Sequence, residues 1–184
     1  MSVDLLLITY NRRQYAEKTV NRLLNSHSDF RLYWWDNGST DGVGDWIEGL
    51  SDPRIALRHR HPTNVMQAQP TFWFLRNARA DVVGKVDDDT LVPEGWLETI
   101  ASAIREERTL GMIGCWTFQK EDFTRNEILA GQKLKKFGRH TVLSNIEIGG
   151  TSVLIRRDLA ERYLMRGHTG TAFPIDRARM SAEG

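Results

Sequence analysis

Three consecutive aspartates, Asp87, Asp88 and Asp89, follow directly on the apolar run 82–86. Adjacent carboxylates repel one another, and at the end of a buried strand water screens that repulsion poorly. A surface loop would tolerate the cluster, whereas a buried strand end calls for a compensating cation, most simply a divalent metal held by oxygen ligands. The triplet therefore predicts a metal site.

The elements around the triplet alternate between apolar runs and helical periods, which is typical of βαβ units. Buried strands are expected at 3–8, 30–35, 55–59, 82–86, 110–118 and 146–155. Helices are expected from Asn11 as cap to Leu24, from Trp46 to Leu50, from Pro70 onward, from Trp96 to Ile104, and from Asp158 to Met165. The pattern predicts an α/β fold with an open, twisted, mostly parallel sheet and helices on both faces.

Two stretches lack such a pattern. Residues 119–145 lose periodicity and gain charge, which predicts a long irregular loop of the kind that often carries function. The tail 166–184 shows no closing element. Within the strand expected at 146–155, Gly149 and Gly150 indicate a bulge or the close approach of a ligand.

Composition narrows the functional classes. A chain of 184 residues with 40% hydrophobic residues suffices for one domain, and its net charge of +1 gives no sign of a nucleic-acid partner. Cys115 is the only cysteine, which excludes an intramolecular disulfide and fits a reducing compartment. The apolar run 5–8 is too short for a signal segment or a transmembrane span. We expect a cytoplasmic protein, with the inner face of a membrane as the alternative location.

Polar turns follow three of the expected strands, at residues 9–11, 36–41 and 87–89. Open α/β sheets bind ligands outside the carboxyl ends of their strands, so this arrangement predicts a nucleotide site. The usual phosphate-binding loops are absent, because there is no GxxxxGK[ST] sequence and Gly42-Val43-Gly44 lacks a third glycine. A metal at the aspartate triplet would hold the diphosphate instead.

Four motifs in this order resemble family 2 glycosyltransferases of the GT-A fold, over about the whole chain. They are Thr9-Tyr10-Asn11-Arg12, Asp36-Asn37-Gly38-Ser39-Thr40-Asp41-Gly42, Asp87-Asp88-Asp89 followed by Pro93, and Gly149-Gly150 followed by Arg156-Arg157. The resemblance implies a nucleotide-sugar donor, Mn or Mg, and transfer to an acceptor hydroxyl with inversion; on the sequence alone, retention stays open. It favours UDP over GDP or dTDP by family habit only.

The resemblance also implies residue roles. Nucleotide contacts fall on Thr9, Tyr10, Asn11, Arg12, Asp36, Asn37, Ser39, Asp87 and Asp88. Asp36 can accept the N3–H of uracil, and Tyr10 can stack on the base. The metal ligands map to Asp87 and Asp89, with Asp88 either a further ligand or a bystander. Lys85 shares a strand face with Asp87 and either reaches the diphosphate or forms a structural ion pair with an aspartate.

The acceptor side is less defined. Asp176 stands where the family has its catalytic base, although Ile175 replaces the expected glutamate, and Glu147 and Glu183 are rivals. The chain is short for such a module, so a base beyond Gly184 is a further alternative. Trp116, Gly149 and Gly150 are the expected acceptor contacts. The acceptor is a carbohydrate, a lipid-linked molecule or another hydroxyl compound.

We expect one domain, 1–184, in which residues 1–118 bind the nucleotide sugar and residues 119–184 form the acceptor half. A non-catalytic nucleotide-sugar-binding module, or a fragment of a larger glycosyltransferase, is the main alternative. An aspartyl phosphatase is a weaker one, because Asp87-x-Asp89-Thr90 resembles a DxDxT loop with its threonine one place early. His59 and His61 share a strand face without a third metal ligand nearby in sequence, which favours an ordinary surface role.

Overall fold

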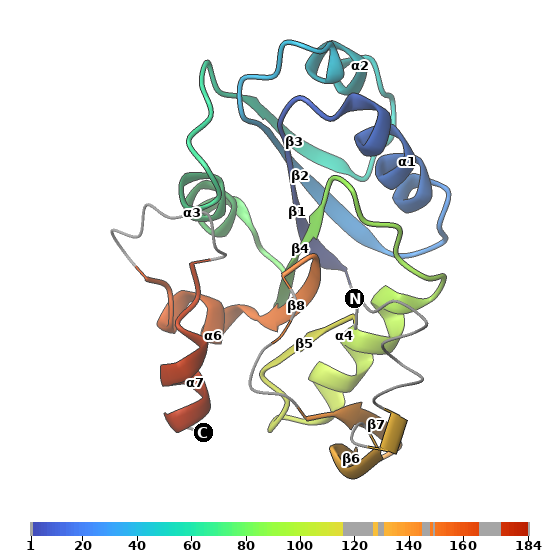
Figure 1. Cartoon of the computed structure of the whole chain (residues 1–184), viewed down its shortest axis with the longest axis vertical. Coiled ribbons are helices and arrows are strands. Elements are labelled where there is room, and N and C mark those ends of the chain that lie inside the picture. Colours follow the sequence, from blue (N-terminus) through green and yellow to red (C-terminus); the bar gives the residue numbers. More distant parts are fainter. Residues whose placement is uncertain are drawn as a thin grey trace.

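A six-stranded sheet forms the centre of the computed structural model, which describes residues 2–115, 127–128, 131–144, 148, 150–165 and 174–183 (Figure 1). Its strands are β1 (Val3–Thr9), β2 (Phe30–Asp36), β3 (Ile55–Arg60), β4 (Val82–Asp87), β5 (Met112–Gly114) and β8 (Ser152–Arg156). They lie in the order β3-β2-β1-β4-β8-β5. The first four strands run parallel, and β8 is antiparallel to both β4 and β5. The predicted mostly parallel sheet is confirmed.

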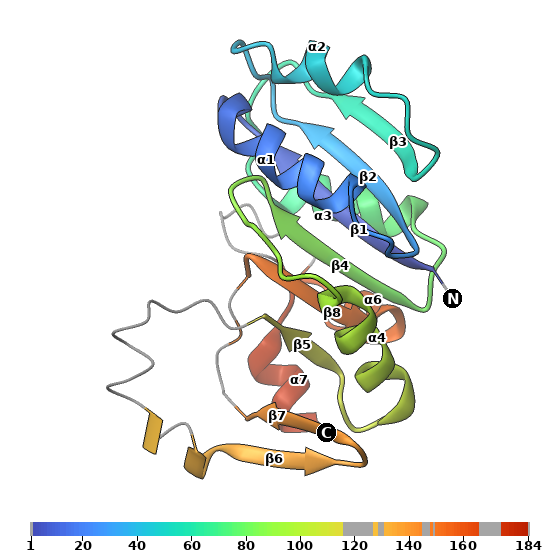
Figure 2. The same cartoon turned by 90° about the vertical axis from the view of Figure 1, so that its right-hand side faces the viewer.

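Helices cover both faces of this sheet, as predicted (Figures 1 and 2). One face carries α1 (Arg13–Leu24), α2 (Val43–Glu48) and α4 (Trp96–Glu106), and the other carries α3 (Ala68–Asn77) and α6 (Arg157–Arg162). Side chains of β1 point alternately to the two faces of the sheet, so Leu5 and Leu7 pack into one core and Leu6 packs into the other. The continuous apolar runs in the sequence reflect this burial on two faces.

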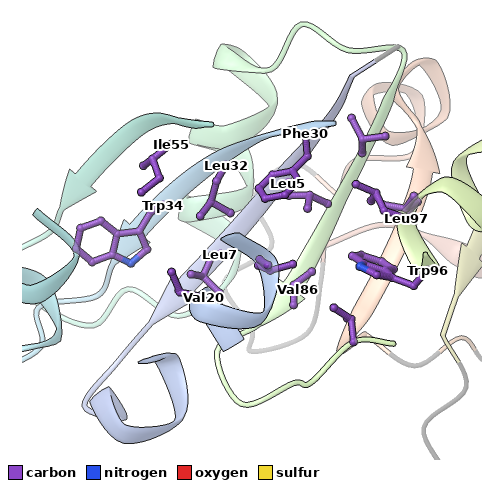
Figure 3. Close-up of a cluster of buried hydrophobic side chains, with 14 of the residues drawn as sticks. Leu5, Leu7, Val20, Phe30, Leu32, Trp34, Ile55, Val86, Trp96 and Leu97 are labelled. Atoms are coloured by element: carbon purple, nitrogen blue, oxygen red, sulfur yellow. The ribbon is translucent and has the colours of Figure 1, made fainter. Parts of the chain in front are cut away.

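The core under α1 and α4 combines large side chains of the parallel strands with side chains of the covering helices (Figure 3). Trp34 of β2 is fully buried there, with Leu7 and Val20 in the same cluster. The indole Nε1 of Trp34 donates a hydrogen bond of 2.9 Å to the hydroxyl of Thr9, the last residue of β1. Packing of this core therefore also fixes a polar residue at the carboxyl end of the sheet.

The chain changes direction across the sheet at β1. It passes outward from β1 to β2 and β3, and then returns to place β4 on the other side of β1. Thr9 lies beside Asp36 in the β1–β2 register, and Ile8 lies beside Asp87 in the β1–β4 register. Ligands of open α/β sheets bind at such a switch point, so the fold brings the three polar turns together there.

Several expectations for the helix ends were wrong. Asn11 does not cap α1, which begins at Arg13; Asn11 instead adopts a left-handed φ of 51° and bonds a neighbouring turn. Pro70 is the third residue of α3 rather than its first. The helix after β8 ends at Arg162, because Leu164 forms a bridge with Ile175.

The C-terminal part contains more regular structure than the sequence predicted. Within the expected loop 119–145, β6 (Leu134–Phe137) and β7 (His140–Leu143) form an antiparallel hairpin that turns at Gly138, whose φ is 54°. The tail closes with α7 (Arg177–Glu183). β8 begins at Ser152, so Gly150 precedes this strand rather than interrupting it. Among the described residues, no helix is both long and apolar enough to cross a membrane.

Candidate active site

Asp36 is the last residue of β2 and belongs to the carboxyl edge, by which we mean the carboxyl ends of β1, β2 and β4 together with the turns that follow them. Its side chain is 1% exposed. The Thr9 hydroxyl donates to Oδ1 at 3.0 Å, and the Ser39 hydroxyl donates to the same oxygen at 2.5 Å. The Ser39 backbone N–H donates to Oδ2 at 3.1 Å. Asp36 is therefore held rigidly, with acceptor capacity left on Oδ2.

Hydrogen bonds join the turns after β1 and β2. The Asn11 backbone N–H donates to the Ser39 hydroxyl at 3.0 Å, and Asn11 Oδ1 accepts from the Thr40 backbone N–H at 2.8 Å. The left-handed φ of Asn11 makes this exchange feasible, and asparagine tolerates that conformation. Tyr10, between Thr9 and Asn11, is 43% exposed and leaves its ring open to solvent.

Asn37 has a different environment from Asp36. It is 3% exposed, and its Oδ1 accepts from the Trp35 indole at 2.9 Å and from the Val65 backbone N–H at 3.3 Å. Its Nδ2 donates to the Met66 carbonyl at 3.1 Å. The amide thus clamps the segment 64–67, in which Met66 has a left-handed φ of 63°. Its assignment to the nucleotide stays a prediction.

The three aspartates after β4 share two cationic partners. Arg12 Nη1 donates to Asp89 Oδ2 at 2.6 Å and lies 4.0 Å from Asp88 Oδ1. The Lys85 ammonium donates to Asp87 Oδ1. The ion-pair alternative for Lys85 is therefore the arrangement observed. Asp87 and Asp89 expose 29% and 42% of their side chains, whereas Asp88 is nearly buried.

Burial disfavours the charged form of this cluster. Desolvation, followed by the charge of Asp89, raises the pKa of Asp88 to about 6. Burial also raises the pKa of Asp87, and the opposing pull of Lys85 does not cancel this effect. Two protein cations thus leave three carboxylates under-compensated, and a bound cation would remove that penalty.

The donor set fits a metal ion that is shared with a substrate. Among the described residues, no three His, Cys, Asp or Glu side chains converge to form a closed protein cage. Magnesium is commonly held by one or two carboxylates together with substrate phosphates and water. The partly exposed carboxylates of Asp87 and Asp89 are suited to that arrangement.

Asp176 has a visible structural role. It directly precedes α7, and its Oδ1 accepts the Arg179 backbone N–H at 3.0 Å, as an N-cap residue does. Its own backbone N–H donates to the Tyr163 carbonyl at 2.9 Å. Neither contact links Asp176 to the carboxyl edge within the part of the chain that the structure describes, so its assignment as the base stays a prediction.

The remaining acceptor-side candidates are only partly covered. Trp116, Gly149 and the rival base Glu147 lie outside the described residues. Glu183 lies in α7, but its side chain is not among those described. A Cβ atom added at Gly150 would meet no atom within 4 Å, so packing within the described chain does not require glycine there.

Two contributors to the edge were missed from the sequence. Thr19 of α1 donates its hydroxyl to the Asp88 carbonyl at 2.9 Å and so ties the helix to the acidic turn. Gln67, just before α3, accepts from the Lys85 ammonium at 3.1 Å. Neither belongs to a motif, and both contacts join residues far apart in sequence, so no local signal could have identified them.

Comparisons with known proteins agree with this geometry. A sequence profile described as Glycosyl transferase family 2 matches residues 4–164. The mannosyltransferase PcManGT from Pyrobaculum calidifontis, solved with GDP-Man and Mn²⁺, is 20% identical with a TM-score of 0.69, over 98% of this chain and 51% of that one. S. aureus TarS 1–349 with UDP-GlcNAc is 19% identical with a TM-score of 0.64, over 88% and 47%.

These likenesses concern the fold, and the chain spans about half the length of either solved structure. A comparison with curated protein sequences gives no match.

Proposed function

The chain belongs to glycosyltransferase family 2, and from this premise we propose that it transfers a sugar from a nucleoside-diphosphate donor, a UDP-sugar in the first place, to an acceptor hydroxyl. The observation that carries the proposal is the juxtaposition of Asp36 and the triplet Asp87–Asp89 on strands that flank β1. Asp36 and its neighbours suit a nucleobase, and the triplet suits a metal-bound diphosphate.

The nucleoside would lie between the turns after β1 and β2. Asp36 keeps an acceptor for an N–H of the base, and the exposed ring of Tyr10 can stack on it. Both uracil and guanine offer such an N–H. The structural neighbours include a GDP-Man complex and a UDP-GlcNAc complex, so the base must be determined by binding.

Asp87 and Asp89 would hold Mn or Mg, with Asp88 as the further candidate. When bound, the ion stabilises the negative charge that develops on the diphosphate leaving group. Arg12 exposes 54% of its side chain and can turn from Asp89 toward the diphosphate. Arg12 would then bind the same negative charge that the metal ion helps to neutralise.

Transfer with inversion needs a base on the acceptor side, and we assign it to Asp176. The acceptor oxygen bonds to the anomeric carbon while the carbon–oxygen bond to the diphosphate breaks, and that electron pair leaves with the diphosphate. The acceptor proton passes to the Asp176 carboxylate. We assign acceptor contacts to Trp116, Gly149 and Gly150, with residues 1–118 as the donor half and 119–184 as the acceptor half.

Calorimetry with UDP, GDP and dTDP, each with and without Mn²⁺, tests the donor assignment. We expect one nucleotide to bind tightly with Mn²⁺, and Asp89→Ala to abolish that binding and sugar transfer. Asp81→Ala is the matched control, because Asp81 also pairs with an arginine but lies just before β4, at its other end. Metal-dependent binding that survives Asp89→Ala would count heavily against the proposal.

A non-catalytic nucleotide-sugar-binding module is the second candidate. The capping role of Asp176 favours it, because that contact gives the carboxylate a purely structural use. Nucleotide binding without donor hydrolysis or transfer, across a broad panel of acceptors, would support this alternative.

A further inference from the structure

Lys85 is a charged residue within the apolar interior. It is 2% exposed and lies in the middle of β4, beside Leu6 of β1 and Val153 of β8. Both neighbours belong to the core beneath α3. A buried ammonium needs nearby oxygen partners, because desolvation strongly disfavours its charge.

Two oxygens meet that need. The ammonium donates to Asp87 Oδ1 and, at 3.1 Å, to Gln67 Oε1. Gln67 occupies the N-cap position of α3, where the helix dipole is positive and therefore repels a cation. An apolar side chain would fill the same space without these penalties. Stability alone thus gives no reason for a lysine here.

The position of Gln67 is itself fixed from the carboxyl edge. Asn37, next to Asp36, binds the Val65 backbone N–H and the Met66 carbonyl. A continuous path of contacts therefore runs from the end of β2 through the segment 64–67 to Lys85 and Asp87. The segment joins the two halves of the site on the α3 side of the sheet.

Lys85 and Arg12 neutralise the triplet in different ways. Arg12 exposes 54% of its side chain and can leave Asp89, whereas Lys85 is enclosed and remains beside Asp87. With both cations in place the triplet keeps one net negative charge. An anionic diphosphate would meet stronger repulsion if the fixed cation were absent.

We propose that Lys85 is a positioning residue for the metal–diphosphate site, with Gln67 as its support. Lys85 binds one oxygen of Asp87, so that Asp87 presents only the other, and it supplies a permanent positive charge that lets an acidic site accept a diphosphate. The inference rests on the proposed function, since it concerns the same metal and donor.

Lys85→Met separates this role from a purely structural one. Without the ammonium the triplet is more negative and Asp87 has both oxygens free, so we expect Mn²⁺ alone to bind on the order of tenfold more tightly. The affinity for UDP at saturating Mn²⁺ should fall by a similar factor. Electron paramagnetic resonance of free Mn²⁺ gives the first affinity and calorimetry the second. A merely structural defect would weaken both.

Gln67→Met is the second variant and retains the charge of Lys85. We expect unchanged affinity for Mn²⁺ alone and about threefold weaker UDP binding, because the ammonium loses one of its two partners. Gln69→Met, an exposed position two residues along α3, is the control and should change neither affinity.

The outcomes distinguish this inference from the function on which it rests. A wild-type protein that binds none of UDP, GDP and dTDP with Mn²⁺ overturns both. If the wild type binds any of the three but Lys85→Met shifts the metal and nucleotide affinities in the same direction, or shifts neither, the role of Lys85 is wrong and the proposed function stands. Circular dichroism establishes that each variant is folded.

Discussion

The carboxylates at the two ends of the parallel strands differ in how fully hydrogen bonds and cations compensate their charge. At the amino edge, formed by the starts of β1, β2 and β4, Asp4 is fully buried and accepts two hydrogen bonds from Arg31, at 2.7 and 2.9 Å. The backbone N–H groups of Arg79 and Ala80 donate to it as well. At the carboxyl edge, the three aspartates of the triplet share two cations.

The pKa values follow the same division. The hydrogen bonds of Arg105 lower the pKa of Asp81 at the amino edge, while burial raises the pKa values of Asp87 and Asp88 at the other. One edge has satisfied its charges and contributes to stability. The carboxyl edge keeps partly exposed carboxylates whose charge a bound cation would neutralise, as expected where stability is given up for function.

Asp4→Ala should have the largest effect and tests the stabilising role of the amino edge. Removing a fully buried, four-fold hydrogen-bonded carboxylate should lower the free energy of unfolding by about 3–5 kcal/mol. Urea denaturation measures this loss, and the folded fraction should still bind nucleotide. The control Asp81→Ala breaks a half-exposed ion pair and should cost about 1 kcal/mol or less. A similar small loss at Asp4 would remove the contrast between the edges.

Asp176 does not fit the division into stabilising and functional carboxylates, because its carboxylate is hydrogen-bonded as an N-cap and is also proposed as the catalytic base. Asparagine caps helices as well as aspartate does but cannot take a proton. Asp176→Asn should therefore keep the thermal midpoint while kcat falls about 100-fold, whereas Asp176→Ala should also lose about 1 kcal/mol of stability. Full activity in Asp176→Asn would show that the carboxylate is a cap only and that the base lies elsewhere.

The carboxyl edge was predictable because its signals are local. An apolar run followed by Asp87–Asp89 marks a strand end, and parallel strands bring their ends to the same side of a sheet. The placement of Thr9 beside Asp36 follows from the same rule. What the sequence could not supply was the contacts that join different elements, since the Lys85–Gln67 hydrogen bond and the Arg12–Asp89 ion pair depend on side-chain directions.

The C-terminal part was harder to predict for a physical reason. The β6 residues Leu134, Lys135 and Lys136 are all exposed, so no alternation of apolar and polar residues marks the strand. Of the α7 side chains that the structure describes, only Met180 packs against the core beneath α3, which is too little for a helical stripe. The Leu164–Ile175 bridge joins distant positions. Weakly buried elements leave weak patterns.

Asp88→Asn sharpens the comparison with a smaller effect of opposite sign. The pKa of Asp88 is about 6, so at pH 7 its carboxyl group is mostly ionised, and the buried charge opposes folding. Asparagine removes the charge and keeps an acceptor, and should raise the free energy of unfolding by about 1 kcal/mol without added metal. Added Mn²⁺ should reduce the gain. A loss of stability would instead place Asp88 with Asp4 as a satisfied carboxylate.

His59 lies in β3, beside Trp35 of β2, and provides the smallest test, which is whether the region next to the carboxyl edge also disfavours a positive charge. The centroid of its imidazole ring lies 4.0 Å from the ring centroid of Trp35 and 5.7 Å from that of Trp73. Burial, followed by the charge of His61, lowers the pKa of His59. The unfolded chain then binds the proton more readily, so the stabilising contribution is complete above about pH 6.5 and is lost as the pH falls below that value.

Protonation of Asp88 stabilises the fold over the same pH range, so the test is the difference between the variant and the wild type. As the pH is lowered from 7.5 to 5.5, the thermal midpoint of His59→Gln should decrease less, or increase more, than that of the wild type. His27→Gln, at an exposed position away from this cluster, should leave the wild-type pH dependence unchanged. Differential scanning calorimetry at matched ionic strength measures both. If His59→Gln leaves the pH dependence unaltered, charging His59 does not destabilise the fold, and burial disfavours the charged form of the aspartates only. The carboxyl edge would then have an excess of negative charge, which a metal ion would neutralise.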